Sequence, residues 1–253
     1  MKLSELNSIL ERKFPKAYAC EWDNDGLMCA ADMDADIKKV LCTLDVTMEA
    51  LEYANRNGFD TIISHHPMIF KYLGALTPEN HVAEKVIFAL KNNINVFSFH
   101  TRFDTMPGGM NDLLAELLDL ENIRIFGDGE SDTGRIGELK SEISIEDFCV
   151  SVKEKLYCDK LSYSKCKDTV KTVAILGGAG KDFIKSAKAE GADVLISGEL
   201  SHSYMTEACE IGISLIEAGH FHTENVACRY FSDFIESLGI ETGYFCSYNI
   251  KTI

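Results

Sequence analysis

Six of the seven histidines in this chain fall within four short segments. These segments are residues 64–67, 99–104, 198–202 and 218–224, and three of them also carry an acidic residue. Each segment follows a stretch that reads as a buried strand, and α/β proteins build sites in loops beyond the carboxyl ends of parallel strands. Mixed imidazole and carboxylate groups bind divalent transition metals. Since random scatter rarely produces such clustering, the sequence favours a metal site.

His65 and His66 are adjacent residues at the end of an expected strand over residues 61–64. Neighbouring side chains of a strand point to opposite faces. The two imidazoles can therefore serve one site only if the chain turns at this point. Pro67 favours a turn, because proline fixes its own φ and cannot extend a strand ladder.

His220 and Glu224 are spaced i and i+4, so they share a face if they begin a helix. Such a pair is half of a site for a divalent ion, although His220 alone would more simply be a helix-cap residue. His222 falls on another face and is expected to support the site or the fold. Asp104 follows His100 in an expected loop, where a metal ligand and a turn-forming aspartate are equally consistent with the sequence.

Two further motifs have simpler interpretations. Residues 177–180 (GGAG) follow a strand and open a helix, but they lack the third glycine of a dinucleotide-binding fingerprint and the Gly-Lys-Ser/Thr of a P-loop. A tight turn is the preferred interpretation over an anion site. The loop at residues 21–27 holds Trp22, the only tryptophan, before Asn24-Asp25-Gly26, and it is either a tight turn with a packed indole or a ligand-contacting loop.

Composition limits the class of protein. The chain has 253 residues, 46% of them hydrophobic and 26% charged, with a net charge of −15. This charge disfavours nucleic acid and anionic membranes as partners. Nine scattered cysteines without a C-x-x-C pair indicate free thiols in a reducing compartment. With no signal-like or membrane-spanning apolar run, a cytoplasmic protein is expected.

Strands and helices alternate along the chain, which predicts the α/β class, with parallel or mixed sheets covered by helices. The best candidate boundary is the Gly-, Asp- and Glu-rich stretch at residues 121–144. We expect a first domain at residues 1–125, carrying His65, His66 and Asp104. A second domain at residues 126–253 would carry His220 and Glu224, with C-terminal elements able to pack back on the first. Strands and helices are expected over residues 1–16 (helix), 39–46 (strand), 47–55 (helix), 61–64 (strand), 80–92 (helix), 95–100 (strand), 110–118 (helix), 145–156 (helix), 161–164 (strand), 170–176 (strand), 181–190 (helix), 193–197 (strand), 202–211 (helix), 214–217 (strand), 221–238 (helix) and 241–246 (strand).

The order and spacing of these motifs resemble the Nif-three-like family, also known as the GTP cyclohydrolase 1 type 2 homologue family. The resemblance covers nearly the whole chain. It is carried by residues 22–27 (WDNDGL), 64–70 (SHHPMIF), 100–104 (HTRFD), 107–112 (PGGMND), 177–180 (GGAG), 191–193 (GAD), 197–199 (SGE) and 218–224 (AGHFHTE).

The resemblance implies two three-layer α/β domains with mixed sheets and a pair of divalent metal ions near the domain junction. It also implies a toroidal homohexamer. The two ions would be zinc, iron or manganese, and Glu224 would bridge them. The metal ligands that it carries over are His65, His66, Asp104, His220 and Glu224.

The leading hypothesis is therefore a metal-dependent hydrolase of the GTP cyclohydrolase 1 type 2 kind, acting on a small, nucleotide-like molecule. His100 and His202 would be its catalytic residues, as proton carriers. A metal-binding or metal-delivery protein without turnover needs the same ligands and is an open alternative. A partner-binding scaffold that assembles through its ring is a third.

Overall fold

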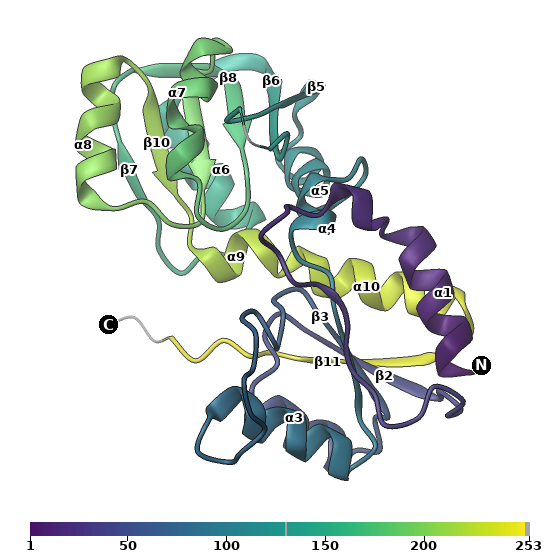
Figure 1. The fold of residues 1–253 in the computed structure, drawn as a ribbon. Coiled ribbons are helices and arrows are strands. Elements are labelled where there is room, and N and C mark those ends of the chain that lie inside the picture. Colours follow the sequence, from purple (N-terminus) through teal and green to yellow (C-terminus); the bar gives the residue numbers. More distant parts are fainter. Residues whose placement is uncertain (130, 251–253) are drawn as a thin grey trace. The chain divides into compact units, whose positions relative to one another are not determined.

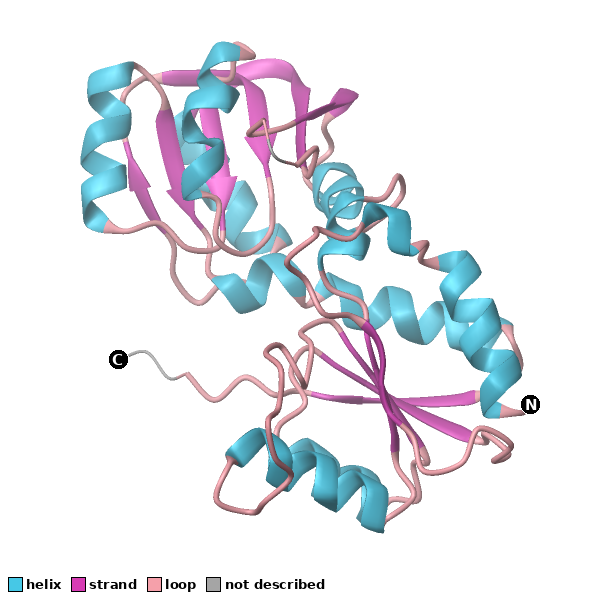
Figure 2. Ribbon diagram, in the orientation of Figure 1, coloured by secondary structure: helices cyan, strands magenta, loops and turns pink. Residues whose placement is uncertain are grey.

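The computed structural model describes residues 1–129 and 131–250, and within them the chain divides into two compact units. Unit 1 comprises Met1–Phe103 and Ala227–Ile250, and unit 2 comprises Asp104–Val226. The division expected at residue 125 falls inside unit 2. The stretch expected as a boundary contains two paired strands, β5 and β6, and Gly127, Asp128, Gly129 and Asp132 lie between them. Figure 2 shows strands and helices in both units.

Unit 1 is a mixed five-stranded sheet between two layers of helices. Four strands are parallel, and the edge strand β1 runs antiparallel to β4. Across the sheet the order is β1 (Gly26–Cys29), β4 (Asn95–Ser98), β3 (Thr61–Ser64), β2 (Lys39–Thr43) and β11 (Glu241–Phe245).

The helices of unit 1 pack on both faces of this sheet (Figure 1). Leu51 and Val86 of α2 (Met48–Arg56) and α3 (His81–Lys91) share a core cluster with Ile62 of β3. On the other face, α1 (Leu3–Lys13) and α10 (Val226–Ser237) meet through Phe14 and Phe231, whose ring centroids are 5.5 Å apart. The helix expected over residues 1–16 buries Leu3, Leu6, Leu10 and Phe14, and Ile9 is half-buried.

Unit 2 is a mixed six-stranded sheet. In order across the sheet its strands are β5 (Glu121–Phe126), β6 (Gly134–Ser144), β8 (Thr169–Ile175), β9 (Val194–Ser197), β10 (Ser214–Glu217) and β7 (Ser162–Ser164). Strands β8, β9 and β10 are parallel, and the other pairs are antiparallel.

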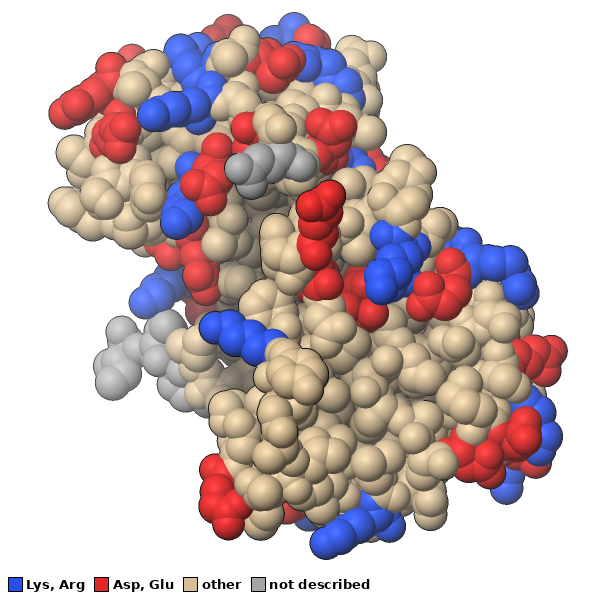
Figure 3. Space-filling view, in the orientation of Figure 1, with Lys and Arg blue, Asp and Glu red and all other residues tan. Residues whose placement is uncertain are grey.

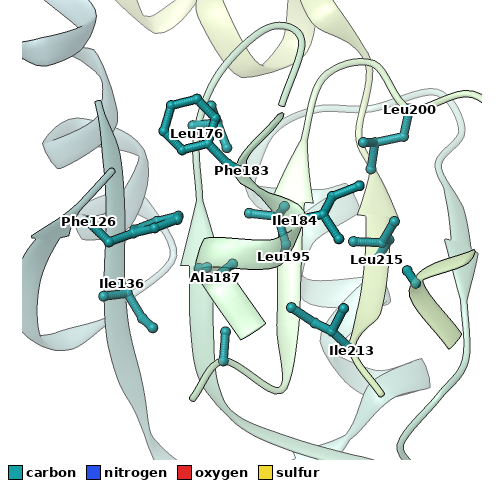
Figure 4. Packing of buried hydrophobic residues seen from close by; sticks show 13 residues of the cluster. Phe126, Ile136, Leu176, Phe183, Ile184, Ala187, Leu195, Leu200, Ile213 and Leu215 are labelled. Atoms are coloured by element: carbon teal, nitrogen blue, oxygen red, sulfur yellow. The ribbon is translucent and has the colours of Figure 1, made fainter. Parts of the chain in front are cut away.

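One face of this sheet is covered by α7 (Ile184–Ala189) and α8 (His202–Ile211), and α6 (Ile145–Lys155) lies on the other (Figure 1). Leu195 and Leu215 of the sheet pack with Ile184 in the core cluster drawn in Figure 4. The remaining helices of the unit are α5 (Met110–Leu117), η2 (Lys181–Phe183) and α9 (His220–Glu224). Helix α4 (Thr101–Thr105) begins in unit 1 and ends in unit 2, since the division falls after Phe103. The expected α/β class with mixed sheets is confirmed.

Most expected elements match the structure, and three differences concern the candidate site. Strand β1 and helix α4 were not expected, because the first has only four residues after a turn signal and the second is a single turn. The single helix expected from residue 221 to 238 is two helices, α9 and α10. No proline or glycine lies at the break between them, so the sequence did not indicate it. A short helix, η1 (Lys16–Tyr18), follows α1.

Two smaller expectations are also resolved. Thr47 caps α2, the helix expected over residues 47–55, with its hydroxyl accepting from the Ala50 N–H at 3.0 Å. All nine cysteines are free thiols, four of them buried and Cys246 exposed. Among the described residues, every helix is too short or too polar to cross a membrane.

Candidate metal centre

Unit 1 brings three histidines together at one end of its parallel strands. His65, His66 and His100 each offer a ring nitrogen within 4.8 Å of the others. The chain turns directly after β3, as predicted, and the Ser64 hydroxyl donates to the His66 carbonyl at 2.8 Å. The rings of His65 and His66 are consequently neighbours, with centroids 5.1 Å apart. Three imidazoles at this spacing are a suitable donor set for a divalent ion.

The same ring nitrogen of all three histidines pairs with an oxygen. Nδ1 of His65 is 2.9 Å from the Phe99 carbonyl oxygen. Nδ1 of His66 is 2.7 Å from Asp45 Oδ1, and Nδ1 of His100 is 3.0 Å from Asp23 Oδ1. Carbonyl and carboxylate oxygens only accept, so each Nδ1 carries a hydrogen, and Nε2 is the ring nitrogen through which these histidines would bind a metal ion. Metal-binding histidines are held in this way.

Asp23, which anchors His100, also accepts hydrogen bonds from another residue. Besides His100, its carboxylate accepts from the Thr101 N–H at 3.0 Å and from the Thr101 hydroxyl at 2.6 Å. Burial alone raises the pKa of Asp23, but the hydrogen bonds and the charge of His100, with the bonds from Thr101, outweigh it and lower this pKa to about 2. Asp23 is therefore an ionised acceptor at neutral pH, which orients His100.

A buried ion pair holds the same loop two residues further on. Arg102, with no exposed surface, donates from Nε and Nη2 to the two carboxylate oxygens of Asp25 at 2.8 and 2.6 Å. Its Nη1 donates to Glu11 at 3.0 Å and to the Phe14 carbonyl at 2.8 Å. Nothing was drawn from Asp25 at the sequence level. Two acidic residues, Asp23 and Asp25, pair with two neighbouring donors, Thr101 and Arg102, in residues 100–104 (HTRFD). This match between acidic residues in one motif and donors in another is the sequence signal that could have revealed both contacts.

Unit 2 supplies a histidine and two carboxylates. His220 and Glu224 lie one turn apart on α9, as expected, with His220 Nε2 2.9 Å from Glu224 Oε2. Nδ1 of His220 is 2.9 Å from Glu199 Oε1. The fourth histidine is thus anchored at Nδ1 like the other three. His220 Nε2 and Glu224 Oε2 are close enough for one divalent ion to bind both groups, which takes an unprotonated ring nitrogen and a carboxylate.

The GGAG turn makes room for this pair, and it is the tight turn that the sequence favoured. A Cβ at Gly178, whose φ is +64°, would lie 2.4 Å from Glu224 Oε1. A Cβ at Gly198 would lie 2.8 Å from the His220 Cα. The Gly178 carbonyl accepts from the Gly198 and Glu199 N–H groups at 2.7 and 2.9 Å, which joins the GGAG loop to the loop after β9. Only glycine permits this approach of backbone to a carboxylate.

The remaining predicted residues lie outside these sets. Asp104 is on α4 rather than in a loop, and its carbonyl accepts from Asn111 at 3.1 Å. His202 is exposed at the start of α8. His222 packs edge-to-face on Phe221, with ring centroids 5.5 Å apart. No role was predicted for the anchors Asp23, Asp45 and Glu199. The acceptor of a histidine Nδ1 can lie at any distance along the chain, so no sequence motif identifies it.

Comparison with known proteins is consistent across nearly the whole chain. Residues 1–248 match the model of the family Duf34/NIF3 (NGG1p interacting factor 3). A Clostridium perfringens protein named GTP cyclohydrolase 1 type 2 homolog is 33% identical over 229 residues, covering 88% of this chain and 87% of the relative. A Clostridium acetobutylicum protein with the same name is 31% identical, over 98% of this chain and 96% of the relative.

Solved structures agree with the sequence comparisons. The crystal structure of Staphylococcus aureus protein SA1388 matches with a TM-score of 0.88 and 25% identity, covering 100% of this chain and 99% of that one. The match includes both mixed sheets. The chain belongs to the Duf34/NIF3 family.

Proposed function

We propose that this protein binds two divalent metal ions and catalyses metal-dependent hydrolysis of a nucleotide-like molecule, in the manner of GTP cyclohydrolase 1 type 2. One observation carries the metal-binding part. Nδ1 of each of the three proposed histidine ligands, His65, His66 and His220, is paired with an oxygen acceptor, which is how metal-binding histidines are held. The names of the clostridial relatives support the reaction class.

The proposed ligands are His65, His66, Asp104, His220 and Glu224, with Glu224 as the bridge. The donor set fits: anchored imidazoles are present in both units, and glycines surround the Glu224 carboxylate. The place of Asp104 in the set rests on the family resemblance. Mixed nitrogen and oxygen donors suit zinc, iron and manganese alike.

Two bound divalent ions would supply a more acidic water and would neutralise charge on substrate oxygens. The chain's own residues would handle the protons. Asp23 holds the Nδ1 hydrogen of His100, so Nε2 of His100 is the atom that takes up and returns a proton. His202, exposed at the start of α8, would be a second carrier that exchanges protons with solvent.

We further propose a homohexamer in the cytoplasm, with neither nucleic acid nor membrane as a partner. The assembly rests on the family resemblance, and the excluded partners follow from the net charge of −15. On the face drawn in Figure 3, acidic and basic side chains are interspersed, which does not resemble the continuous basic surface that phosphate backbones need.

Turnover of GTP by metal-loaded protein tests this function. Wild type is compared with His65→Ala and Glu224→Ala, and with His81→Ala as a matched control, since His81 is exposed and lies outside the four segments. We expect turnover in wild type and control and its loss, with loss of metal, in the two site variants. If all four proteins are equally inert while metal content still falls in the site variants, the protein binds metal without catalysis.

A further inference from the structure

Trp22 and Phe70 form an exposed aromatic surface beside His100, here called the aromatic rim. Trp22 is 62% exposed and Phe70 is 44% exposed. The Trp22 centroid lies 6.0 Å from that of Phe70 and 6.2 Å from that of His100, and Phe70 is also 6.2 Å from His100. All three pairs are edge-to-face. The rim is thus continuous with the three-histidine group.

The two loops that carry the rim are held together. Asn24 Nδ2 donates to the Ile69 carbonyl, which joins the loop of Trp22 to the loop of Phe70. The neighbouring residues Asp23 and Asp25 are bound to Thr101 and Arg102 of α4. The chain segment that carries the indole is therefore held at the residues next to Trp22, although most of the indole faces solvent. A pre-positioned aromatic ring loses little conformational entropy when it binds a ligand.

A fixed, exposed indole has a specific chemical preference. Large aromatic side chains are usually covered, and their flat π faces bind other flat rings. Base–aromatic stacking of this kind tolerates different bases, because every base has a π face. The rim consists of two rings beside an imidazole, far fewer residues than the roughly 20–30 that each side of a standard protein interface contributes.

We propose that the aromatic rim binds the planar heteroaromatic ring of the substrate, a purine-type base, by stacking on Trp22 against Phe70. The reacting part of the substrate would then lie at His65, His66 and His100. This inference deepens the proposed function and rests on it for the nature of the substrate. The base-binding step itself requires no metal, so it can be tested separately.

Trp22 is the chain's only tryptophan, so indole fluorescence reports on the rim alone. Guanosine and ribose 5-phosphate are titrated into the protein as purified and after metal removal with EDTA. We expect saturable quenching by guanosine in both forms and none by ribose 5-phosphate, which lacks the ring. Phe70→Leu should weaken guanosine binding roughly five- to 150-fold, the range for loss of one stacking partner.

Tyr72→Ala is the matched control, because Tyr72 is a 95% exposed aromatic residue of the same loop as Phe70. Its guanosine affinity should equal that of wild type. Trp22→Leu, measured by calorimetry, should lose affinity by at least the same factor as Phe70→Leu. Both rim residues are exposed, so each variant is expected to keep the wild-type Tm.

Three results would overturn the rim proposal: no saturable quenching by guanosine, equal quenching by ribose 5-phosphate, or unchanged affinity in both rim variants. A fall in oligomeric state of Trp22→Leu with unchanged guanosine affinity would also overturn it and would assign the rim to a contact between copies. Guanosine binding without GTP turnover would leave the rim intact and refute only the hydrolase. GTP turnover, together with unchanged guanosine affinity in both rim variants, would refute the rim proposal and leave the hydrolase intact.

Discussion

Asp23 Oδ1 accepts a hydrogen bond from Nδ1 of His100 at 3.0 Å, with the aspartate carboxylate fully shielded from solvent. This bond fixes which nitrogen of His100 faces the other two histidines. It also ties the loop of the aromatic rim to the end of β4. Orientation of the histidine group and stability of unit 1 are therefore linked through one carboxylate.

Asp23→Asn should destabilise the protein by about 1–3 kcal/mol at pH 7, because an amide has one acceptor oxygen, whereas the two carboxylate oxygens of Asp23 accept from three donors. Burial raises the pKa of Asp23, but the contacts with His100 and Thr101 outweigh burial and lower this pKa from 3.8 to about 2. A lowered pKa stabilises the fold above the unfolded value and loses that contribution as pH falls. The difference between variant and wild type should stay constant from pH 7 to about 5 and shrink as pH falls from about 4 toward 2. Urea unfolding across this range checks it, and a difference that grows on acidification would contradict it.

Gly178→Ala should remove Glu224 from its position. The new Cβ would lie 2.4 Å from Glu224 Oε1, and the residue would keep a φ of +64°. Gly191→Ala is the control, since its φ is +88° but nothing lies within 4 Å of the added Cβ. Both variants should lose about 1 kcal/mol or more from backbone strain. Only Gly178→Ala should also lose bound metal, measured by elemental analysis; equal metal content in the two variants would show that the clash is absorbed without moving Glu224.

Glu199→Ala should weaken metal binding by about ten- to 100-fold, because it removes the acceptor that orients His220. The fold should be retained, since the Glu199 side chain is 60% exposed. Glu210→Ala, at an exposed position on α8, is the control. Competition titration with a chromogenic chelator measures the affinity. Equal metal affinities for the two variants would show that Glu199 does not orient His100's counterpart in unit 2, His220, for metal binding.

Arg102→Ala should cost about 3–5 kcal/mol of unfolding free energy, because it leaves the buried Asp25 carboxylate without its partner. Arg229→Ala removes an exposed arginine that pairs with Asp233 along α10 at 3.7 Å. That control should change stability by less than about 0.5 kcal/mol. Chemical denaturation of the two variants compares them directly, and similar small losses would mean that the Arg102–Asp25 pair contributes no net stability.

Local sequence signals predicted the elements well where one feature dominates. Strand β3 and helices α2 and α8 follow from apolar runs and from the Thr47 cap. The i, i+4 pair His220 and Glu224 follows from helical periodicity alone. The turn that brings His65 to His66 follows from Pro67.

Long-range relationships were harder to predict. The pairing of β5 with β6 turned an expected boundary into a sheet, since strand partners are not encoded by composition. The same limit hid the Nδ1 acceptors of the histidines, which come from 21 to 77 residues away in the chain for His66, His220 and His100. The resemblance to a family supplied ligand identities, whereas the structure supplied the residues that orient them.

Elemental analysis of the protein purified without a histidine tag tests the central claim most directly. Wild type and the His81→Ala control should each hold two divalent ions per chain. His66→Ala and Asp104→Ala should each lose most of that metal. Full metal content in both site variants, or none in wild type, would contradict the proposed metal centre.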